Sequence, residues 1–324
     1  MKKVAVLTSG GDAPGLNACI RAIVRTAYYY EISVIGIKRG YRGLIEKDYC
    51  ELDPRRVGGI INKGGTILHS SREPRFKHFE FRKKAFETLK ELQVDALLVI
   101  GGNGSISAAN IFAKEFPINV IGIPKTIDND LYGTDYTIGF DTAVNNAVDA
   151  VDKIRDTTIS HERIFVVEVM GRDSGFIALD VGIATGADIT LIPEYPFPIH
   201  IVIQKLIDSY KKGKTFSIII LAEGVAKAQE LASVLEQKLK DYAIGGIRYS
   251  VLGHIQRGGS PTAFDRNIAS RFGAFAVERF LHGEKNFMVA YEKGEIKTKP
   301  LEIPFGKVKK PDLEVFELTK KLTI

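Results

Sequence analysis

Cysteine, tryptophan and long apolar runs are scarce in this 324-residue sequence, which has two cysteines and no tryptophan. Cys19 and Cys50 are too few for a disulfide framework, and no Cys-x-x-Cys motif occurs, so both are expected to be thiols in a reducing compartment. The apolar run that starts at Val4 ends at Thr8, which is too short for a signal peptide. No run approaches the roughly 20 residues that a membrane helix needs. We therefore expect a cytoplasmic protein without membrane contacts.

The charge balance is modest, with 45 Lys and Arg residues against 39 Asp and Glu residues and a formal net charge of +6. This excess favours anionic ligands, either phosphorylated small molecules or nucleic acid. No stretch combines basic residues with interleaved aromatic side chains, so phosphate esters are favoured over nucleic acid as partners. The chain is long enough to bury two cores.

Apolar runs of strand length alternate with helical patterns along the chain. The predicted strands are residues 3–7, 32–37, 95–100, 119–123, 163–169, 216–221, 248–252 and 288–291. The predicted helices are residues 16–30, 105–114, 142–155, 199–212 and 226–242, a long helix that ends near 281, and a last helix from 311. The pattern restarts near Gly139. It predicts an α/β fold of two similar doubly wound domains with mostly parallel sheets.

Two glycine-rich stretches, Gly10–Asn17 and Gly101–Ser105, each follow a predicted strand and open a predicted helix. Glycine lets backbone N–H groups approach a phosphate closely, and the helix dipole favours negative charge there. Neither stretch matches the dinucleotide-binding or the Walker pattern. Tight packing explains one such turn equally well, but two turns in matched positions favour a polyphosphate held between them.

An acidic stretch follows the predicted strand Asn119–Ile123, which is expected to end at Pro124 because proline cannot donate a ladder hydrogen bond. Thr126, Asp128 and Asp130 lie directly beyond it. Carboxylates at the carboxyl end of a buried parallel strand sit where open α/β sheets bind ligands. Beside a polyphosphate, such an acid can accept a proton from an attacking hydroxyl or hold Mg²⁺ through water. A turn with solvated acids is the alternative.

Cationic residues gather at the later predicted strand ends. They are Arg163, Arg172, Arg248, His254 and Arg257. Arginine forks match phosphate oxygens bidentately, so this set predicts a pocket for a phosphorylated ligand. Arg21 and Arg25 share one face of the first helix, where they are either solvated or hold an anion between them.

These stretches resemble the bacterial-type 6-phosphofructokinase family (the phosphofructokinase A family) from Val4 to about Leu281. The motifs that carry the resemblance, in the family's order, are Gly10-Gly-Asp-Ala-Pro-Gly-Leu-Asn17, Lys63-Gly-Gly-Thr66, Gly101-Gly-Asn-Gly-Ser105, Pro124-Lys-Thr-Ile-Asp-Asn-Asp130, Ser160-His-Glu-Arg163, Met170-Gly-Arg172 and Gly253-His-Ile-Gln-Arg-Gly-Gly-Ser-Pro261. The resemblance implies the phosphofructokinase fold and transfer of the γ-phosphoryl group of ATP, with Mg²⁺, to O1 of fructose 6-phosphate.

The resemblance also implies residue roles. Asp128 matches the catalytic base, Arg172 matches a stabiliser of the transition state, and Asp130, Thr126 and Gly11 complete the catalytic set. The ATP-binding positions are Gly11, Arg72, Glu73, Gly102, Asn103, Gly104 and Ser105. The positions that bind fructose 6-phosphate are Thr126, Ile127, Asp128, Arg163, Met170, Gly171, Arg172, Glu223, Arg248, His254, Ile255, Gln256 and Arg257. Asn103 and Asp130 match the metal site.

The implied ATP-binding domain is residues 1–139 plus about 256–306, and the implied fructose 6-phosphate domain is about 140–255 plus 307–324. Arg163 and Arg248 match residues that reach the sugar phosphate of a neighbouring subunit, so a homotetramer with shared active sites is implied. An effector site for ADP or phosphoenolpyruvate is partly matched, at Arg21, Arg25, Arg155, Gly186, Asp188, Lys212 and Lys214. Pro54, Thr215 and Phe216 depart from the family's basic residues there, so regulation stays open.

Three positions bear on the phosphoryl donor. Asn103 stands where the family usually has a metal-binding Asp, which leaves an uncharged oxygen ligand. Lys125 stands where ATP-using members commonly have Gly and pyrophosphate-using members commonly have Lys, and it is expected to neutralise phosphate charge. Gly104 matches the ATP users, because pyrophosphate users place an Asp there. ATP is therefore the expected donor. A pyrophosphate-dependent enzyme and a non-catalytic sugar-phosphate sensor are the alternatives.

Overall fold

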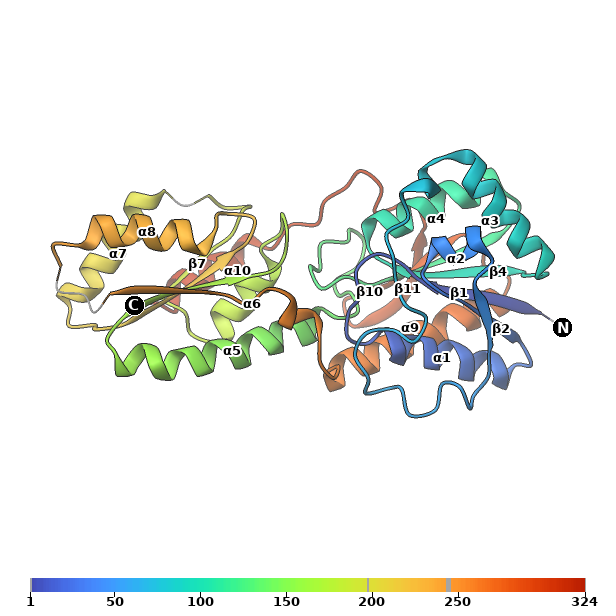
Figure 1. The fold of residues 1–324 in the computed structure, drawn as a ribbon, viewed down its shortest axis with the longest axis horizontal. Coiled ribbons are helices and arrows are strands. Elements are labelled where there is room, and N and C mark those ends of the chain that lie inside the picture. The colour runs from blue at the N-terminus through green and yellow to red at the C-terminus, as the bar shows by residue number, and fades with distance from the viewer. Residues whose placement is uncertain (1, 197, 243–245, 324) are drawn as a thin grey trace. The chain divides into compact units, whose positions relative to one another are not determined.

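The computed structural model describes residues 2–196, 198–242 and 246–323. The chain forms two compact units, Met1–Thr142 with Arg257–Lys309 and Ala143–Gln256 with Lys310–Ile324 (Figure 1). Each unit is built on one sheet, of seven strands in the first unit and four in the second, counted over the described residues. Most neighbouring strands are parallel, which confirms the predicted α/β class.

The first unit's sheet has the strand order β11-β10-β5-β4-β1-β2-β3. Its strands are β1 (Lys3–Thr8), β2 (Ser33–Ile37), β3 (Tyr49–Leu52), β4 (Ala96–Gly101), β5 (Asn119–Pro124), β10 (Phe287–Glu292) and β11 (Glu295–Pro300). The two edge strands, β3 and β11, pair antiparallel, and the other pairs are parallel. The central strands read as unbroken apolar runs because helices cover both of their faces.

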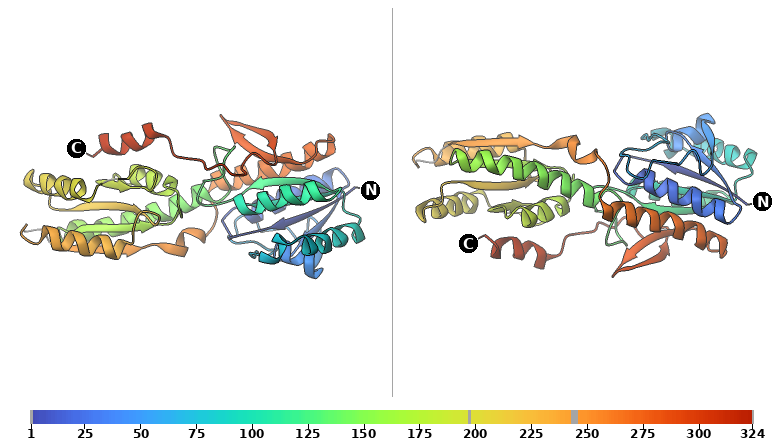
Figure 2. Two further views of the ribbon diagram at one scale, coloured as in Figure 1. Left: turned by 90° about the horizontal axis from the view of Figure 1, so that it is seen from above. Right: turned by 90° about the horizontal axis from the view of Figure 1, so that it is seen from below.

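Successive side chains of β1 enter two separate cores, as the alternation of a strand requires. Val4 and Val6 pack toward α1 (Leu16–Tyr29) and α9 (Ala263–Leu281), which lie side by side (Figure 2). Ala5 and Leu7 pack into the core of the opposite face. The helices of that face are α2 (Tyr41–Glu46), α3 (Phe79–Glu91) and α4 (Asn103–Glu115), with the short 3-10 helix η1 at Pro74–Lys77 (Figure 1).

The second unit has four parallel strands in the order β7-β8-β6-β9. They are β6 (Ile164–Val169), β7 (Ile189–Leu191), β8 (Ser217–Ala222) and β9 (Ile247–Val251). The helices are α5 (Phe140–Ser160), which starts three residues before this unit, then α6 (Phe176–Ala184), α7 (Ile199–Lys211), α8 (Ala228–Leu239) and α10 (Leu313–Lys321). Apolar residues of α7 and α8 form one core with β6, β7 and β8.

The fully buried strands and the long helices lie within a few residues of the predicted ranges. The strand ends at Pro124 as expected, and Pro124, the last residue of β5, pairs with Gly101 of β4. Its carbonyl accepts a hydrogen bond from Ile138 N–H at 3.1 Å, so the turn that follows is tied back to the end of the strand. Besides the 3-10 helices, six α-helices and strands of the described residues were not predicted: α2, α3, α6, β3, β7 and β11. In the described part of the chain, no helix is long and apolar enough to cross a membrane.

Asp265 is a buried acid in the first turn of α9 that binds the start of α5. Its carboxylate accepts hydrogen bonds from Gly139 N–H at 2.8 Å, Thr142 N–H at 2.8 Å and the Thr142 hydroxyl at 2.5 Å. Burial outweighs these bonds and raises the pKa of Asp265 from 3.8 to about 6. The folded protein therefore binds this proton more tightly than the unfolded chain does.

We predict that the stability contributed by Asp265 is complete below about pH 4 and is lost as the pH rises to about 6. The loss amounts to about 3 kcal/mol, at roughly 1.4 kcal/mol per pKa unit. In Asp265→Asn this dependence is absent, so the variant gains stability relative to the native chain over that interval. Urea unfolding of both proteins between pH 4 and 7 measures the difference, and a difference that stays constant with pH contradicts the prediction.

Candidate functional site

Three turns follow the carboxyl ends of neighbouring strands in the first unit's sheet. Strands β1, β4 and β5 are parallel neighbours, with Thr8 opposite Ile100 and Gly101 opposite Pro124. The three strands therefore end at one level. The turns that follow, residues 9–15, 102–105 and 125–130, include both glycine-rich stretches and the acidic stretch. The carboxyl edge of a parallel sheet is where open α/β proteins bind ligands.

The first glycine turn is held by hydrogen bonds to its backbone. The Ser70 hydroxyl donates to the Gly10 carbonyl at 2.5 Å, and Gly10 N–H donates to the Ser71 carbonyl at 3.3 Å. Gly10 has φ +84°, a conformation that favours glycine. Because a trans peptide directs its N–H away from its carbonyl, Gly11 N–H points away from Ser70.

Arg257 packs directly on this turn, within the first unit. Its Nη2 donates to the Asp12 carbonyl at 2.8 Å, and its Nε lies 3.5 Å from Asp12 Oδ1. A Cβ atom on Gly11 would lie 2.0 Å from Arg257 Nη2. Only glycine at position 11 leaves room for the guanidinium group in this place.

The second glycine turn opens α4 and is tied to the first turn. Ser105 Oγ and Ser9 Oγ are hydrogen-bonded at 2.9 Å. A Cβ atom on Gly101 would lie 2.4 Å from Ser105 Cβ, whereas one on Gly104 would meet no described atom within 4 Å. Gly101 thus permits close packing of the turn, and Gly104 leaves open space. The N-terminus of α4 presents backbone N–H groups, and helix N-termini of this kind bind anions.

Lys125, the first residue after β5, connects the two glycine turns. Its side chain is 3% exposed. Its Nζ donates to the carbonyls of Ser9, at 3.3 Å, and of Gly11. Its backbone N–H donates to the Gly101 carbonyl at 3.0 Å.

The acidic turn is ordered by hydroxyl groups. Asp128 N–H donates to the Thr126 hydroxyl at 3.1 Å, and that hydroxyl lies 3.3 Å from Asp128 Oδ2. The Thr137 hydroxyl donates to the Thr126 carbonyl at 2.6 Å. Asp128 is only 2% exposed, and Asn129 takes the left-handed conformation with φ +51°. A buried carboxylate in a fixed turn fits an acid-base role better than the alternative of solvated acids.

Asn103 and Asp130 meet where the second glycine turn and the acidic turn approach each other. Asn103 Nδ2 donates to Asp130 Oδ2 at 3.1 Å. The other atom of the amide, Asn103 Oδ1, is buried and has no hydrogen-bond partner among the described residues. An unsatisfied oxygen beside a carboxylate suits a hard cation such as Mg²⁺. The described residues contain no cluster of three or more His, Cys, Asp or Glu side chains that could hold a metal.

Arg72 and Glu73 lie on the segment that leads into η1. Arg72 is exposed. Glu73 is engaged within the protein, because it accepts from Arg75 N–H at 3.0 Å and pairs with the Arg75 guanidinium at 2.7 Å. These hydrogen bonds from Arg75 lower the pKa of the Glu73 carboxyl group. Glu73 therefore stays ionised and supports this turn.

In the second unit, the loop after β6 is held in an unusual conformation. Arg172 has φ +53° and Gly171 has φ +144°. Glu223, which follows β8, accepts from Gly171 N–H at 3.1 Å and from Arg172 N–H at 2.8 Å through the same oxygen. A Cβ atom on Gly224 would lie 2.2 Å from the Arg172 carbonyl oxygen. Strained non-glycine backbone of this kind clusters at functional sites.

Other residues predicted for the sugar phosphate lie on the same unit. Gln256 is fully buried, and its Oε1 accepts from Met170 N–H at 2.9 Å. His254 and Ile255 are exposed in η2 (Gly253–Arg257), and Arg248 is exposed on the edge strand β9. Gln256 thus supports the loop at 170–172, while His254, Ile255 and Arg248 face outward.

The residues predicted for an effector fall on both units. Arg21 and Arg25 lie on α1 of the first unit, and Arg155, Gly186, Asp188, Lys212 and Lys214 lie on the second. In the second unit Lys214 pairs with Asp188, whose other oxygen accepts from Ile218 N–H at 2.8 Å. Arg155 donates to the Thr185 carbonyl. Asp188 is thus already bound within its own unit.

Sequence reasoning assigned no role to Ser9, Ser70 or Tyr41, although each of them holds a glycine turn. The Tyr41 hydroxyl, for example, donates to the Ser105 carbonyl at 2.7 Å. Ser9 adjoins the first glycine motif and was within reach of sequence reasoning. Tyr41 and Ser70 lie 64 and 60 residues from their partners, and no local pattern marks them.

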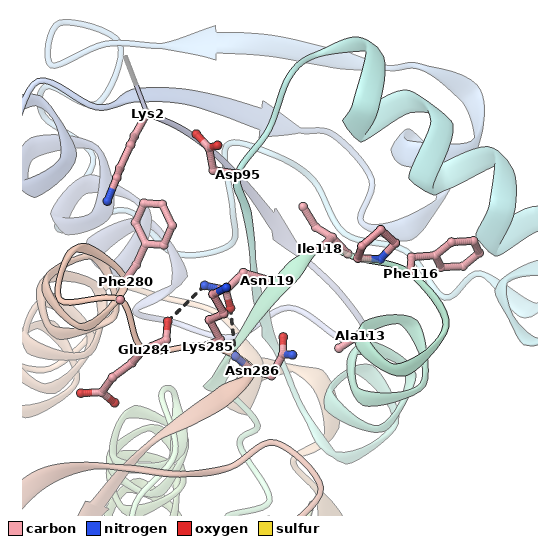
Figure 3. Close-up of a pocket in the computed structure, with 12 residues that line it drawn as sticks. Lys2, Asp95, Ala113, Phe116, Ile118, Asn119, Phe280, Glu284, Lys285 and Asn286 are labelled. Atoms are coloured by element: carbon pink, nitrogen blue, oxygen red, sulfur yellow. Dashed lines mark hydrogen bonds between the residues drawn. The ribbon is translucent and has the colours of Figure 1, made fainter.

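A cavity of about 470 Å³ opens at the amino ends of β1, β4, β5 and β10. The three turns lie at the opposite ends of β1, β4 and β5. Lys2, Asp95, Phe116 and Phe280 are among its lining residues (Figure 3). The polar groups of Asn119 are used by the Glu284 carbonyl and by Asn286 N–H. Its basic and acidic side chains balance, so this cavity has no preference for a phosphate.

The fold and the three turns define an open α/β protein whose glycine turns and acidic turn follow the carboxyl ends of parallel strands, where proteins of this class bind ligands. Residues 3–280 match the sequence model of the Phosphofructokinase family. The chain belongs to that family.

Relatives of known name are similar over their whole length. The ATP-dependent 6-phosphofructokinase of Persephonella marina is 64% identical over 324 residues, which are 100% of both chains. The protein of the same name from Aquifex aeolicus is 52% identical over 99% of this chain and 100% of its own.

Solved structures confirm the fold. Phosphofructokinase from Saccharomyces cerevisiae superposes with a TM-score of 0.87 at 34% identity, over 99% of this chain and 46% of the yeast chain. This chain therefore spans about half the length of the yeast chain. A pyrophosphate-dependent phosphofructokinase from Marinobacter aquaeolei superposes with a TM-score of 0.84 at 24% identity, over 97% of this chain and 86% of its own, which shows a shared fold only.

Two glycines of the second turn make a matched test of its packing. We predict that Gly101→Ala destabilises the protein by about 1–3 kcal/mol, because the new methyl group overlaps Ser105. Gly104→Ala, in the first turn of α4 with open space around it, should be neutral or stabilising by up to about 1 kcal/mol. Chemical denaturation of both variants measures the difference, and equal stabilities would contradict the close contact between Gly101 and Ser105.

Proposed function

We propose that the chain is an ATP-dependent 6-phosphofructokinase of glycolysis. It transfers the γ-phosphoryl group of ATP to O1 of D-fructose 6-phosphate and yields fructose 1,6-bisphosphate and ADP. The observation that carries this proposal is the 64% identity, over 100% of both chains, to a relative named for that activity. The glycine turns and the acidic turn, which follow the carboxyl ends of β1, β4 and β5, supply the chemistry that such a transfer needs.

The first unit is the proposed ATP-binding domain. Backbone N–H groups of the turn at Gly11 and of Gly102–Ser105 donate to phosphate oxygens, and Arg72 supplies an exposed positive charge. Phosphoryl transfer requires mostly positioning and charge neutralisation, because charge spreads over the oxygens of the transferring group. Turns whose backbone is already held in place supply that positioning without reorganisation.

Asp128 is the proposed base. Its carboxylate accepts the proton of the sugar's O1 hydroxyl as that oxygen attacks the γ-phosphorus, and burial together with the turn keeps the group in one orientation. Thr126 and Ile127 share the turn and lie beside the reacting groups. Asp130 and Asn103 are the residues that would hold Mg²⁺, which when bound supplies positive charge to the phosphate oxygens.

The second unit is the proposed sugar-phosphate domain. Arg172, presented by the loop that Glu223 fixes, stabilises the negative charge of the transition state. Met170, Gly171, Glu223 and the segment 254–257 form the remaining contacts with fructose 6-phosphate. Arg163 and Arg248 reach the sugar phosphate of a neighbouring subunit in a homotetramer, and the exposure of Arg248 is compatible with this.

Gly104 favours ATP over pyrophosphate as the donor. The open space around it leaves room for a nucleotide, whereas an acidic side chain there would fill that space. Regulation by ADP or phosphoenolpyruvate and the cytoplasmic location stay predictions. The effector hypothesis is weakened by the bonds that already engage Asp188.

The deciding experiment compares phosphoryl donors. With fructose 6-phosphate, we expect turnover with ATP that depends on Mg²⁺ concentration, and none above background with pyrophosphate. A coupled assay of fructose 1,6-bisphosphate formation measures both. Turnover with pyrophosphate alone would replace the donor, and binding of fructose 6-phosphate without any turnover would establish a sensor instead.

Asp128→Asn tests the base. The amide cannot accept the hydroxyl proton, so we expect kcat to fall by about 10²–10⁴-fold. The affinity for fructose 6-phosphate, measured by calorimetry, should change little because the turn is held by the backbone and by Thr126. A kcat within a few-fold of the native enzyme would assign the proton transfer to another group.

A further inference from the structure

Lys125 occupies an unusual position for an ammonium group. It is buried at the end of β5, and its Nζ is bonded to two carbonyls of the first glycine turn, those of Ser9 and Gly11. Its own N–H is bonded to Gly101 at the start of the second turn. One residue therefore contacts both of the turns that are proposed to hold the donor's phosphates.

These bonds set the orientation of two peptide groups. A trans peptide points its N–H opposite to its carbonyl, so the carbonyls of Ser9 and Gly11, facing Lys125, turn the N–H groups of Gly10 and Asp12 away from it. Gly10 N–H indeed donates in another direction, to the Ser71 carbonyl. Glycine rotates easily about its backbone bonds, so a turn with two adjacent glycines needs such an external hold.

We propose that Lys125 is a positioning residue for phosphoryl transfer. Its ammonium group fixes the peptide planes on both sides of the Gly10–Gly11 peptide, whose N–H is proposed to face the phosphoryl donor, and its backbone N–H ties this turn to the second one. It therefore acts through the backbone of residues 9–12 and not as a phosphate ligand. This inference rests on the proposed function, because it concerns the donor site of that reaction.

Two substitutions distinguish positioning of the turn backbone from a direct effect of the positive charge of Lys125 on the phosphates. Lys125→Met and Lys125→Gly both remove the charge. Methionine keeps the apolar stem and fills the space, so the carbonyls of Ser9 and Gly11 lose their donor with no replacement. Glycine empties the space between two carbonyls, which is polar and large enough for water to enter and bond to them.

The experiment measures kcat/KM for ATP at saturating fructose 6-phosphate in the native enzyme, both variants and Lys114→Met, an exposed lysine of α4 used as a control. We expect Lys125→Met to fall at least about tenfold below Lys125→Gly. The control should match the native enzyme. The affinity for fructose 6-phosphate, measured by calorimetry, should stay within about twofold in all four proteins.

Equal values for the two variants overturn the proposal. If both are equally impaired, Lys125 acts through its charge, and if both match the native enzyme, it has no role in transfer. A native enzyme without ATP turnover would instead refute the proposed function.

Hydrogen exchange covers the case in which Lys125→Met does not fold. Amides of residues 9–12 in Lys125→Gly should then exchange faster than in the native chain, because water is a less fixed partner than the ammonium group. Unchanged exchange overturns the proposal.

Discussion

The parallel register of β1, β4 and β5 is the constraint on which the candidate site depends. Thr8 stands opposite Ile100 and Gly101 opposite Pro124, so three strands stop at one level. The turns that follow come from positions roughly 90 and 20 residues apart in the sequence, and they are neighbours only because of this pairing. A one-residue slip of any strand would turn its apolar side chains to the wrong core and shift its turn, so burial and function depend on the same register.

Close packing around these turns depends on glycines, because a side chain at those positions would overlap a neighbouring group. Gly11 leaves space for the guanidinium group of Arg257, and Gly101 leaves space for Ser105. In the second unit, Gly224 lets the Arg172 carbonyl come near. The buried charged groups have partners inside the turns, because the Thr126 hydroxyl lies against the Asp128 carboxylate and the Ser9 carbonyl accepts from the Lys125 ammonium group.

The strands that were predicted from the sequence differ from those that were missed in burial or in length. Residues 96–101 of β4 are all buried and apolar up to the final glycine, so their run stands out. Residues 295–300 of β11 are partly exposed and carry two lysines, and they form a strand only because β10 offers a free edge. Residues 189–191 of β7 are too few for a periodic signal. Tertiary pairing, and not local pattern, makes these segments strands.

The sequence alone determined the α/β class, the glycine turns and the acidic stretch with Asp128, because burial periodicity and spacing within a motif are local properties of the chain. The tertiary structure decided what those residues contact. Three sets of hydrogen bonds show this. Lys125 donates to the carbonyls of Ser9 and Gly11, and Asn103 donates to Asp130. The Tyr41 hydroxyl donates to the Ser105 carbonyl. These contacts join positions 27 to 116 residues apart, and only the pairing of strands and the packing of helices brings such positions together.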